Sequence, residues 1–282
     1  MRGWGDRCLV HLAYLWRHRR LLNLDDPQRF TELVQVRKLF DRDPRLPRLI
    51  DKVMAKDHVS SQIGAAWVTP TLWEGTELPA KPRWDLPFVI KSRHGCNQRI
   101  FVRDQSVDWA AVRRAASSWM RRPYGSWLAE WGYRDVPRGI IVEPFVGPAL
   151  TLPIDYKLYV MHGHVAAVQV HLDRETRHRW ILLDRDWRPL SRSPAPLRPD
   201  ALDRMFRAAE TLSAGVDFVR VDFYDVHPHP RFAEMTFYPG SGLDRFEMDS
   251  VDTWLGSLWN KSSNFARCTE PVISPVNKTF VI

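Results

Sequence analysis

The sequence predicts an α+β fold in which antiparallel hairpins and amphipathic helices follow one another along 282 residues. Polarity alternates with a period of two in the run VRVDFY and again in FAEMTFY, as in strands with one buried face. The short proline-rich link HPHP joins the two runs, so residues 216–242 are expected to form an antiparallel hairpin. A second hairpin is expected at residues 154–175, and residues 200–214 have the apolar spacing of a helix.

Composition and charge narrow the class of protein. The chain is 44% hydrophobic and 26% charged, as in a folded globular protein. Its formal charge of +8 would suit nucleic acid, but the arginines are spread along the chain without a recognition motif. We therefore expect no nucleic acid and favour ATP, an anionic glycan or a lipid headgroup. The few, widely spaced cysteines, Cys8, Cys96 and Cys268, argue against disulfides or a zinc site and favour the reducing cytoplasm.

The first 60 residues are expected to be helical. Apolar residues alternate with basic ones over residues 1–22, so this segment could rest on a membrane surface, although we favour docking on the protein itself. No segment approaches the roughly 20 apolar residues of a membrane span. Asp26 and Pro27 are expected to start a helix that runs to about residue 40. Residues 51–63 should form another helix, with Gly64 as its stop.

The next segment, residues 61–145, is expected to contain a small sheet. Residues 65–71 should be a short strand or extended run, and a strand should end at Lys91. The polar loop that follows contains Ser92, Gly95 and Asn97, and could fold its backbone N–H groups over an anion. Ser106 is expected to cap a helix that runs to about residue 122. A further strand, residues 138–146, carries Glu143 immediately before a proline.

The two hairpins place polar side chains on common faces. Asp155, Lys157 and Tyr159 would share one face of the first strand of the 154–175 hairpin. If Asp222 lies opposite Glu234 in the other hairpin, Arg220 lies opposite Thr236, and a slip by one residue would separate them. Alone, this face would be interpreted as a solvated sheet surface. Two histidine pairs, at 162/164 and 227/229, are interpreted as turn residues rather than metal ligands.

Taken in order, these motifs resemble the ATP-grasp superfamily. The resemblance lies in an Asp-Lys helix, the Pro-Phe-Val-Ile-Lys strand, the Glu-Pro strand, and the Arg-x-Asp strand followed by Glu-x-Thr and Pro-Gly. Within the superfamily the chain is similar to the TupA-like branch, which is associated with teichuronopeptide and other cell-surface polysaccharides. The branch's motifs are Phe-x-Glu at residues 30–32, Asp-Tyr-Lys at 155–157, R-V-D-x-Y, and E-x-T-F-x-P-G-S-G. The resemblance covers about residues 23–258.

The resemblance implies a fold in which two α+β subdomains clasp ATP. Residues 1–60 would be a shortened helical N-terminal region, 61–145 the small lid subdomain, 146–259 the large subdomain with a metal site, and 260–282 a tail. The implied activity is a cytoplasmic ATP- and Mg²⁺-dependent carboxylate–amine ligase, which forms an amide through an acyl phosphate and releases ADP. Two alternatives stay open: an ATP-grasp kinase that phosphorylates an alcohol, and a non-catalytic module that binds an anionic glycan or a nucleotide.

The resemblance also implies roles for individual residues. Lysines from two elements suit a triphosphate as point charges, and carboxylate oxygens are the ligands that Mg²⁺ prefers. Thr236 stands where most members have Asn, and a hydroxyl is the shorter and weaker ligand. Phe145 is expected to donate its N–H to the adenine, because Pro144 cannot. The implied set is Lys52, Lys91, Ser92, Gly95, Glu143, Phe145, Asp155 and Lys157 for ATP, Asp222, Glu234 and Thr236 for the metal, Arg220 for catalysis, and Gly240 and Ser241 for substrate.

Overall fold

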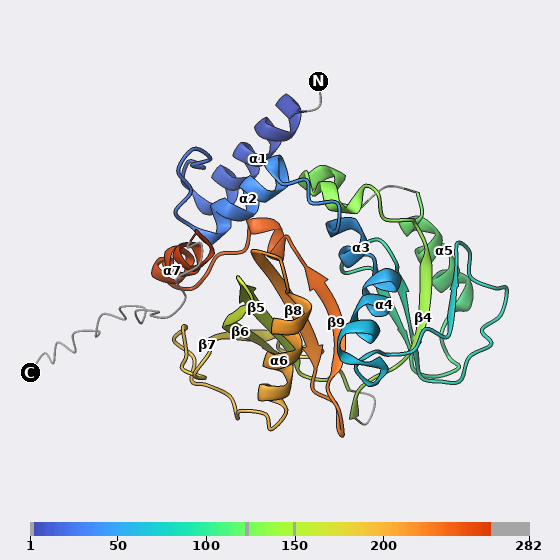
Figure 1. Ribbon diagram of the computed structural model, residues 1–282. Coiled ribbons are helices and arrows are strands. Elements are labelled where there is room, and N and C mark those ends of the chain that lie inside the picture. The colour runs from blue at the N-terminus through green and yellow to red at the C-terminus, as the bar shows by residue number, and fades with distance from the viewer. Residues whose placement is uncertain (1–2, 122–123, 149–150, 261–282) are drawn as a thin grey trace, which may run out of the picture.

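The computed structural model describes residues 3–121, 124–148 and 151–260, and it is built on two antiparallel sheets (Figure 1). The first sheet has the strand order β1-β4-β2-β3, and the second has the order β7-β6-β5-β8-β9. Helices and antiparallel strands thus mix in one α+β fold, as the sequence predicts. The strands are β1 Trp73–Gly75, β2 Phe88–Ser92, β3 Arg99–Val102, β4 Ile140–Pro144, β5 Asp155–Met161, β6 His164–Leu172, β7 Arg179–Asp184, β8 Phe218–Tyr224 and β9 Arg231–Thr236.

The first sheet packs its apolar face on helix α5, Trp109–Trp119. Phe88 and Ile90 of β2 alternate toward this helix and are fully buried with it in one cluster. The predicted helix start at Ser106 is wrong, because the Asp108 carboxylate caps the helix by accepting from the Ala111 N–H. Ser106 instead turns back and donates to Asp104. The helix ends at Trp119, a few residues before the predicted end at about residue 122.

The second sheet forms the main core with helix α6, Leu202–Leu212. The chain reverses between β5 and β6 at His162 and Gly163, whose φ angles of 49° and 83° give the left-handed turn of a tight hairpin. The residues that alternate with the polar face of β8, Val219, Val221 and Phe223, are fully buried. Both predicted hairpins are therefore confirmed.

The N-terminal helices precede both sheets in the chain, and two of them pack between the sheets. Figure 1 shows α3 and α4 between β9 and β4, while α2 lies beside α7 and α1 lies beside α2. The predicted helix start at Asp26 and Pro27 is wrong, since α2 begins at Phe30 and the Glu32 carboxylate accepts from the N–H groups of Gln28 and Arg29. The helices are α1 Gly3–His18, α2 Phe30–Phe40, α3 Leu46–Ile50, α4 Lys52–Ile63 and α7 Asp249–Asn260, with short 3₁₀ turns at Ala65–Trp67, Ser126–Leu128, Trp131–Tyr133 and Pro239–Gly242.

Helix α4 follows its sequence signals closely. Asp51 is its N-cap and accepts from Val53 and Met54, and Gly64 ends it with a φ of 99°. The extended run expected at residues 65–71 is wrong at its start, which is the 3₁₀ turn Ala65–Trp67. Within the described residues, no helix has the length and apolar content needed to cross a membrane. Most of the predicted tail, with Cys268, lies outside the described residues, and the division at 60, 145 and 259 stays a prediction.

Candidate functional site

The register of β8 and β9 sets the centre of the site. Asp222 pairs with Glu234, and Arg220 pairs with Thr236. This is the register assumed from the sequence, and it brings all four side chains to one face of the sheet. A bulge follows between Asp222 and Phe223 and leaves Ala233 without a partner, so the polar face ends there.

Asp222 is held between two cations. The guanidinium of Arg220 donates from Nε to Oδ1 at 2.8 Å and from Nη2 to Oδ2 at 2.7 Å, which is a bidentate contact. Lys157, which lies opposite Asp222 on β5, donates from Nζ to Oδ2 at 2.5 Å. The Asp222 side chain is fully buried. Its ionised form is therefore matched on both sides by protein groups.

Arg220 also connects the other two members of the predicted metal set. Its Nη2 lies 3.4 Å from Oε1 of Glu234 and 3.3 Å from Oγ1 of Thr236. The side chain of Glu234 is 30% exposed. Burial would raise the pKa of Glu234, but the charges of Lys157 and Arg220 outweigh burial and hold the pKa below its ordinary value. Glu234 is thus an ionised carboxylate with a face open to a ligand.

Asp155 lies on the other side of Lys157. Its Oδ2 is 2.9 Å from Lys157 Nζ and 3.6 Å from Nη2 of Arg174, whose guanidinium lies 5.6 Å above the Tyr224 ring. The Oδ1 atom of Asp155 is buried without a hydrogen-bond partner among the described residues. A buried unpaired acceptor is costly unless a donor arrives. A ligand hydroxyl would satisfy it, as the prediction of a ribose contact requires.

Glu143 holds two lysines from different elements. Its Oε2 accepts from Lys91 Nζ at 2.5 Å, and its Oε1 forms an ion pair with Lys56 of α4. The sequence did not identify Lys56 as a partner of Glu143, and it indicated Lys52 of the same helix as the functional lysine. Lys52 donates instead to the carbonyl oxygen of Gly95 in the polar loop. The signal for Lys56 was its position four residues after Lys52, on the same helical face.

Two residues predicted to contact ATP make hydrogen bonds within the protein. The Phe145 N–H donates to the carbonyl oxygen of Pro87 at 3.0 Å, so its donor is used within the sheet in this structure. Ser92 is fully buried, and its hydroxyl lies 3.4 Å from the Gly95 carbonyl oxygen. Ser92 therefore braces the polar loop from within, rather than facing a ligand.

The predicted substrate loop at Gly240 and Ser241 is a left-handed turn that is held by hydrogen bonds from helix α2. Gly240 and Ser241 have φ angles of 52° and 58°, and a Cβ at Gly240 would overlap the carboxylate of Asp244. The carbonyl oxygen of Ser241 accepts from Nε2 of Gln35 at 2.9 Å and from Nζ of Lys38 at 2.5 Å. Helix α2 thus sets the conformation of this turn.

A cleft of about 800 Å³ runs along these groups, a size suited to a nucleotide and a small substrate. It does not include three predicted residues, Ser92, Glu143 and Phe145. The predicted residues that line it are Lys52, Lys91, Gly95, Asp155, Lys157, Arg220, Asp222, Glu234, Thr236, Gly240 and Ser241.

Other groups in the cleft were missed from the sequence. Glu130 lines it, and burial raises the pKa of Glu130 to about 7 although Lys38 opposes the shift. The ring nitrogens of His171 and His178 lie 2.9 Å apart on the cleft wall, and burial lowers the pKa of His171 to about 3. His171 pairs with Asp155 across β5 and β6, so its place on the alternating face of β6 was the available signal. Glu130 lies outside any periodic segment and gave none.

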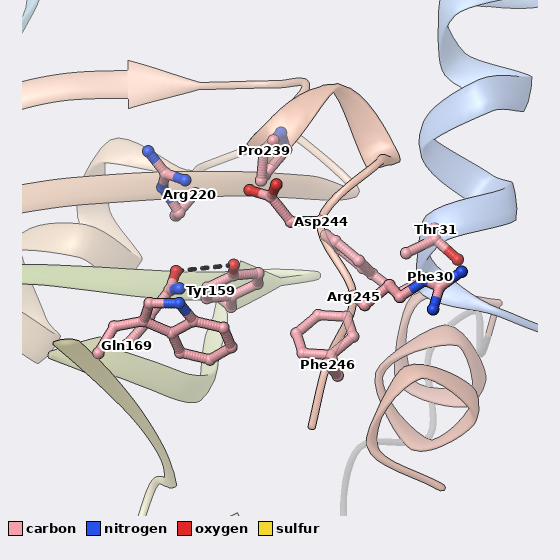
Figure 2. A pocket seen from close by; sticks show the side chains of 11 residues that line it. Phe30, Thr31, Tyr159, Gln169, Arg220, Pro239, Asp244, Arg245 and Phe246 are labelled. Atoms are coloured by element: carbon pink, nitrogen blue, oxygen red, sulfur yellow. Dashed lines mark hydrogen bonds between the residues drawn. The ribbon is translucent and has the colours of Figure 1, made fainter. Parts of the chain in front are cut away.

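A water-sized hollow of about 20 Å³ adjoins Arg220 beyond the main cleft. Figure 2 shows the Asp244 carboxylate pointing toward the Arg220 guanidinium, with Tyr159 and Gln169 joined by a hydrogen bond beneath them. Asp244 belongs to both the hollow and the cleft, and its carboxylate has no hydrogen bond within the described part of the chain. Burial raises the pKa of Asp244 above its ordinary value. The group is therefore placed to accept a donor or proton beside Arg220.

The donor set of the cleft fits an anion together with a hard divalent cation. Lys91, Lys157 and Arg220 give positive charge for phosphates. Within the described residues no cluster of three or more His, Cys, Asp or Glu side chains could hold a metal alone. Mg²⁺ is usually bound by one or two carboxylates, with phosphate and water completing its shell. Asp222 and Glu234 supply that number, so the residues fit Mg²⁺ carried with a polyphosphate.

The Glu143 ion pairs predict a pH dependence of stability. Burial would raise the pKa of Glu143, but Lys91 and Lys56 outweigh it and hold the pKa below 4.5. Because the folded pKa is depressed, the stabilisation is complete above about pH 5 and is lost as the pH falls through the folded value. Glu143→Gln leaves two partly exposed lysines unpaired and should lower the free energy of unfolding by about 2–3 kcal/mol at pH 7.

Urea unfolding of wild type and Glu143→Gln between pH 7 and pH 3 measures this difference. We expect the two unfolding free energies to approach each other below about pH 4.5. A constant difference across that range would show that the charge of Glu143 contributes nothing to folding. Glu77→Gln is the matched control, because Glu77 is largely exposed and pairs only with the half-exposed Arg113.

One family model matches most of the chain, and a solved structure gives a likeness in fold. The sequence model described as TupA-like ATPgrasp matches residues 32–260. The L-amino acid ligase from Bacillus licheniformis is 14% identical with a TM-score of 0.50, over 76% of this chain and 49% of that one. The D-alanine–D-alanine ligase from Bacillus anthracis complexed with ATP is 14% identical with a TM-score of 0.43, over 67% and 54%. The chain spans about half the length of these structures, and the likeness concerns the fold. No curated protein matches the sequence significantly.

Proposed function

The chain belongs to the TupA-like ATP-grasp family, and from this membership and the geometry of the cleft we propose an ATP- and Mg²⁺-dependent carboxylate–amine ligase. One observation carries the proposal. Arg220, Asp222, Glu234 and Thr236 meet on one face of β8 and β9, inside a cleft that Lys91 also lines. That arrangement supplies both the charge and the carboxylates that phosphoryl transfer needs.

The nucleotide would lie between the two sheets. Lys91 and Lys157 would neutralise its phosphates, and the loop that contains Gly95, held by Lys52, would cover them. Asp155 would accept a ribose hydroxyl through its unpaired Oδ1. We propose residues 61–145 as the lid subdomain and 146–259 as the large subdomain, because this division places one sheet on each side of the nucleotide.

Asp222 and Glu234 would hold Mg²⁺, with the Thr236 hydroxyl as the weaker third group. Held by these residues, the ion would supply positive charge that neutralises the transferring phosphate. The protein's own contribution is the positive charge beside both carboxylates. Burial raises the pKa of Asp222 above its ordinary value, and Arg220 and Lys157 oppose that shift by direct contact. Their charges also hold the pKa of Glu234 below its ordinary value.

The proposed reaction has two transfers. A carboxylate oxygen of the first substrate attacks the γ-phosphorus, and the bond between that phosphorus and the β–γ bridging oxygen breaks. The products of this first transfer are ADP and an acyl phosphate. The amine nitrogen of the second substrate then attacks the acyl carbon, phosphate leaves, and the amine loses one proton as the amide forms. Arg220 stabilises charge on the transferring phosphoryl group. Gly240 and Ser241 would hold the anionic substrate, and Asp244 lies where the amine proton can be accepted.

The substrates we propose are an amino acid or similar acid and an amine used in cell-surface polysaccharide or small-metabolite assembly. The support for this class is the TupA-like family match. The cleft adds one physical constraint, because its lining carries both cationic groups and the acids Glu130 and Asp244. It therefore suits an acid at one position and an amine at another.

An ADP-release screen of carboxylates against amines tests the function, with Mg²⁺ present and hydroxylamine as a trap. We expect ADP release to depend on a carboxylate and hydroxylamine to convert the acyl phosphate to a hydroxamate. ADP release with an alcohol, and no hydroxamate, would identify a kinase instead. Absence of turnover and of Mg-ATP binding at about millimolar concentration by calorimetry would contradict the proposal.

A further inference from the structure

Helix α1 has two apolar faces, and the residues that the structure describes cover only one of them. Val10 and Tyr14 are buried against the rest of the protein, in a cluster with Leu22 and Ala129. The opposite face exposes its apolar side chains at positions three, four or eight residues apart, so they lie along one side of the helix. Their exposed fractions are 82% for Trp4, 38% for Leu9, 66% for Leu12, 42% for Leu15 and 68% for Trp16.

The apolar surface extends beyond the helix. Leu21 is 79% exposed just after it, and Trp127 is 67% exposed two residues before Ala129, which packs under the helix. Scattered apolar side chains on a surface are ordinary, but a continuous group of this kind marks a binding face. We call Trp4, Leu9, Leu12, Leu15, Trp16, Leu21 and Trp127 the exposed face of α1.

Basic residues outnumber acids in and just after helix α1. The single acid of the helix is Asp6, which pairs with Arg134. Arg7, Arg17 and Arg19 are exposed, and the Arg17 Nε donates to the Leu243 carbonyl oxygen. Tryptophan and leucine bordered by arginine is the composition of helices that lie in a membrane interface, with arginine beside anionic headgroups.

The same face reaches the mouth of the cleft. Trp16 and Trp127 belong to the exposed face of α1 and also line the cleft that contains Arg220 and Glu234. A surface that covers this face would therefore lie at the opening of the site. A bilayer in this position could present a lipid-linked substrate, whose head group would reach the cleft while its tail stays in the lipid.

We propose that the exposed face of α1 binds an anionic membrane surface, with the helix lying in the plane of the interface. The binding does not depend on the ligase chemistry. It comes from burial of the apolar side chains in the headgroup region, with added attraction between the exposed arginines and the lipid charge. Trp4 and Leu12 are the most exposed of the helix residues that do not also line the cleft.

Co-sedimentation of the full chain with vesicles tests the proposal. The vesicles are phosphatidylcholine alone, or phosphatidylcholine with about a third phosphatidylglycerol. We expect binding to the anionic vesicles that weakens with salt, and quenching of tryptophan fluorescence when the lipid carries brominated chains. Trp4→Ser with Leu12→Ser should lower the partition coefficient by at least about tenfold. The control Leu72→Ser with Leu197→Ser, which also removes exposed apolar groups, should bind like wild type.

Two results would overturn the proposal. One is equal sedimentation of wild type and the Trp4/Leu12 variant, with no quenching by brominated lipid in the wild type. The other is a dimer in sedimentation velocity that the Trp4/Leu12 variant abolishes, since the face would then bind a second copy. Circular dichroism and Mg-ATP calorimetry on both double variants check that the fold is intact. The quenching measurement on wild type does not depend on any variant.

Discussion

Arg220→Lys is expected to slow ADP release by about a hundredfold or more while leaving the protein folded. Lysine keeps the positive charge, so Asp222 still has two cations beside it. It cannot reproduce the two parallel contacts of 2.8 Å and 2.7 Å, and it cannot reach Glu234 and Thr236 at the same time. The charge on the transferring phosphoryl group would then lack an oriented donor, although the net charge of the site is unchanged.

Initial rates of ADP release, with KM for ATP and for the carboxylate measured separately, distinguish this from a loss of binding. We expect the change in kcat, because Arg220 acts on charge that develops during transfer. Arg185→Lys is the matched control, since Arg185 pairs with Glu210 on the outer side of the second sheet. A kcat within about threefold of wild type in Arg220→Lys would remove Arg220 from the catalytic role.

The polar face of the β8–β9 hairpin could be predicted because two physical constraints agree there. Val219, Val221 and Phe223 must be buried, and a slip of one residue would expose them. The same alternation that fills the core therefore fixes the partners of Arg220 and Asp222. The alternation of side chains and the packing of the core therefore require the same register for β8 and β9, and this register could be predicted from the sequence.

Hydrogen-bond and ion-pair partners that come from distant elements were not predicted. The choice between Lys52 and Lys56 depends on how α4 approaches β4, and nothing in the helix distinguishes the two lysines. The Phe145 N–H was assigned to adenine on chemical type alone, but the sheet extends far enough for Pro87 to accept from it. A backbone N–H at the end of a strand donates to the neighbouring strand when an acceptor there is within reach.

The acids of the cleft illustrate the same limit. Glu130 and Lys38 are both buried, yet they come from a 3₁₀ region and a helix about 90 residues apart in the sequence. Their mutual effect on pKa exists only once α2 packs against that region. Asp244 likewise becomes part of the site only through the turn at Gly240, whose left-handed φ brings its backbone against that carboxylate.

Glu234→Gln is expected to abolish carboxylate-dependent ADP release, at least about a hundredfold, with little change in stability. Its side chain is 30% exposed, and its Oε1 forms an ion pair with Nη2 of Arg220 at 3.4 Å. Removing that charge should change the free energy of unfolding by less than about 1 kcal/mol. Asp222→Asn should also abolish activity, but it removes the buried carboxylate between Arg220 and Lys157, which keep Glu234 at 3.4 Å and Asp155 at 2.9 Å. We therefore expect it to destabilise the protein by about 3–5 kcal/mol.

The contrast between these two variants separates metal binding from folding. Urea unfolding gives the stability of each, and calorimetry with ATP, in the presence and absence of Mg²⁺, gives the metal-dependent part of binding. In Glu234→Gln we expect the Mg²⁺ enhancement of ATP binding to fall while ATP alone binds as in wild type. If turnover survives in the double variant of Asp222→Asn with Glu234→Gln, these carboxylates do not hold the metal. Activity lost only in Asp222→Asn, together with stability, would assign that residue to the charge balance of the sheet instead.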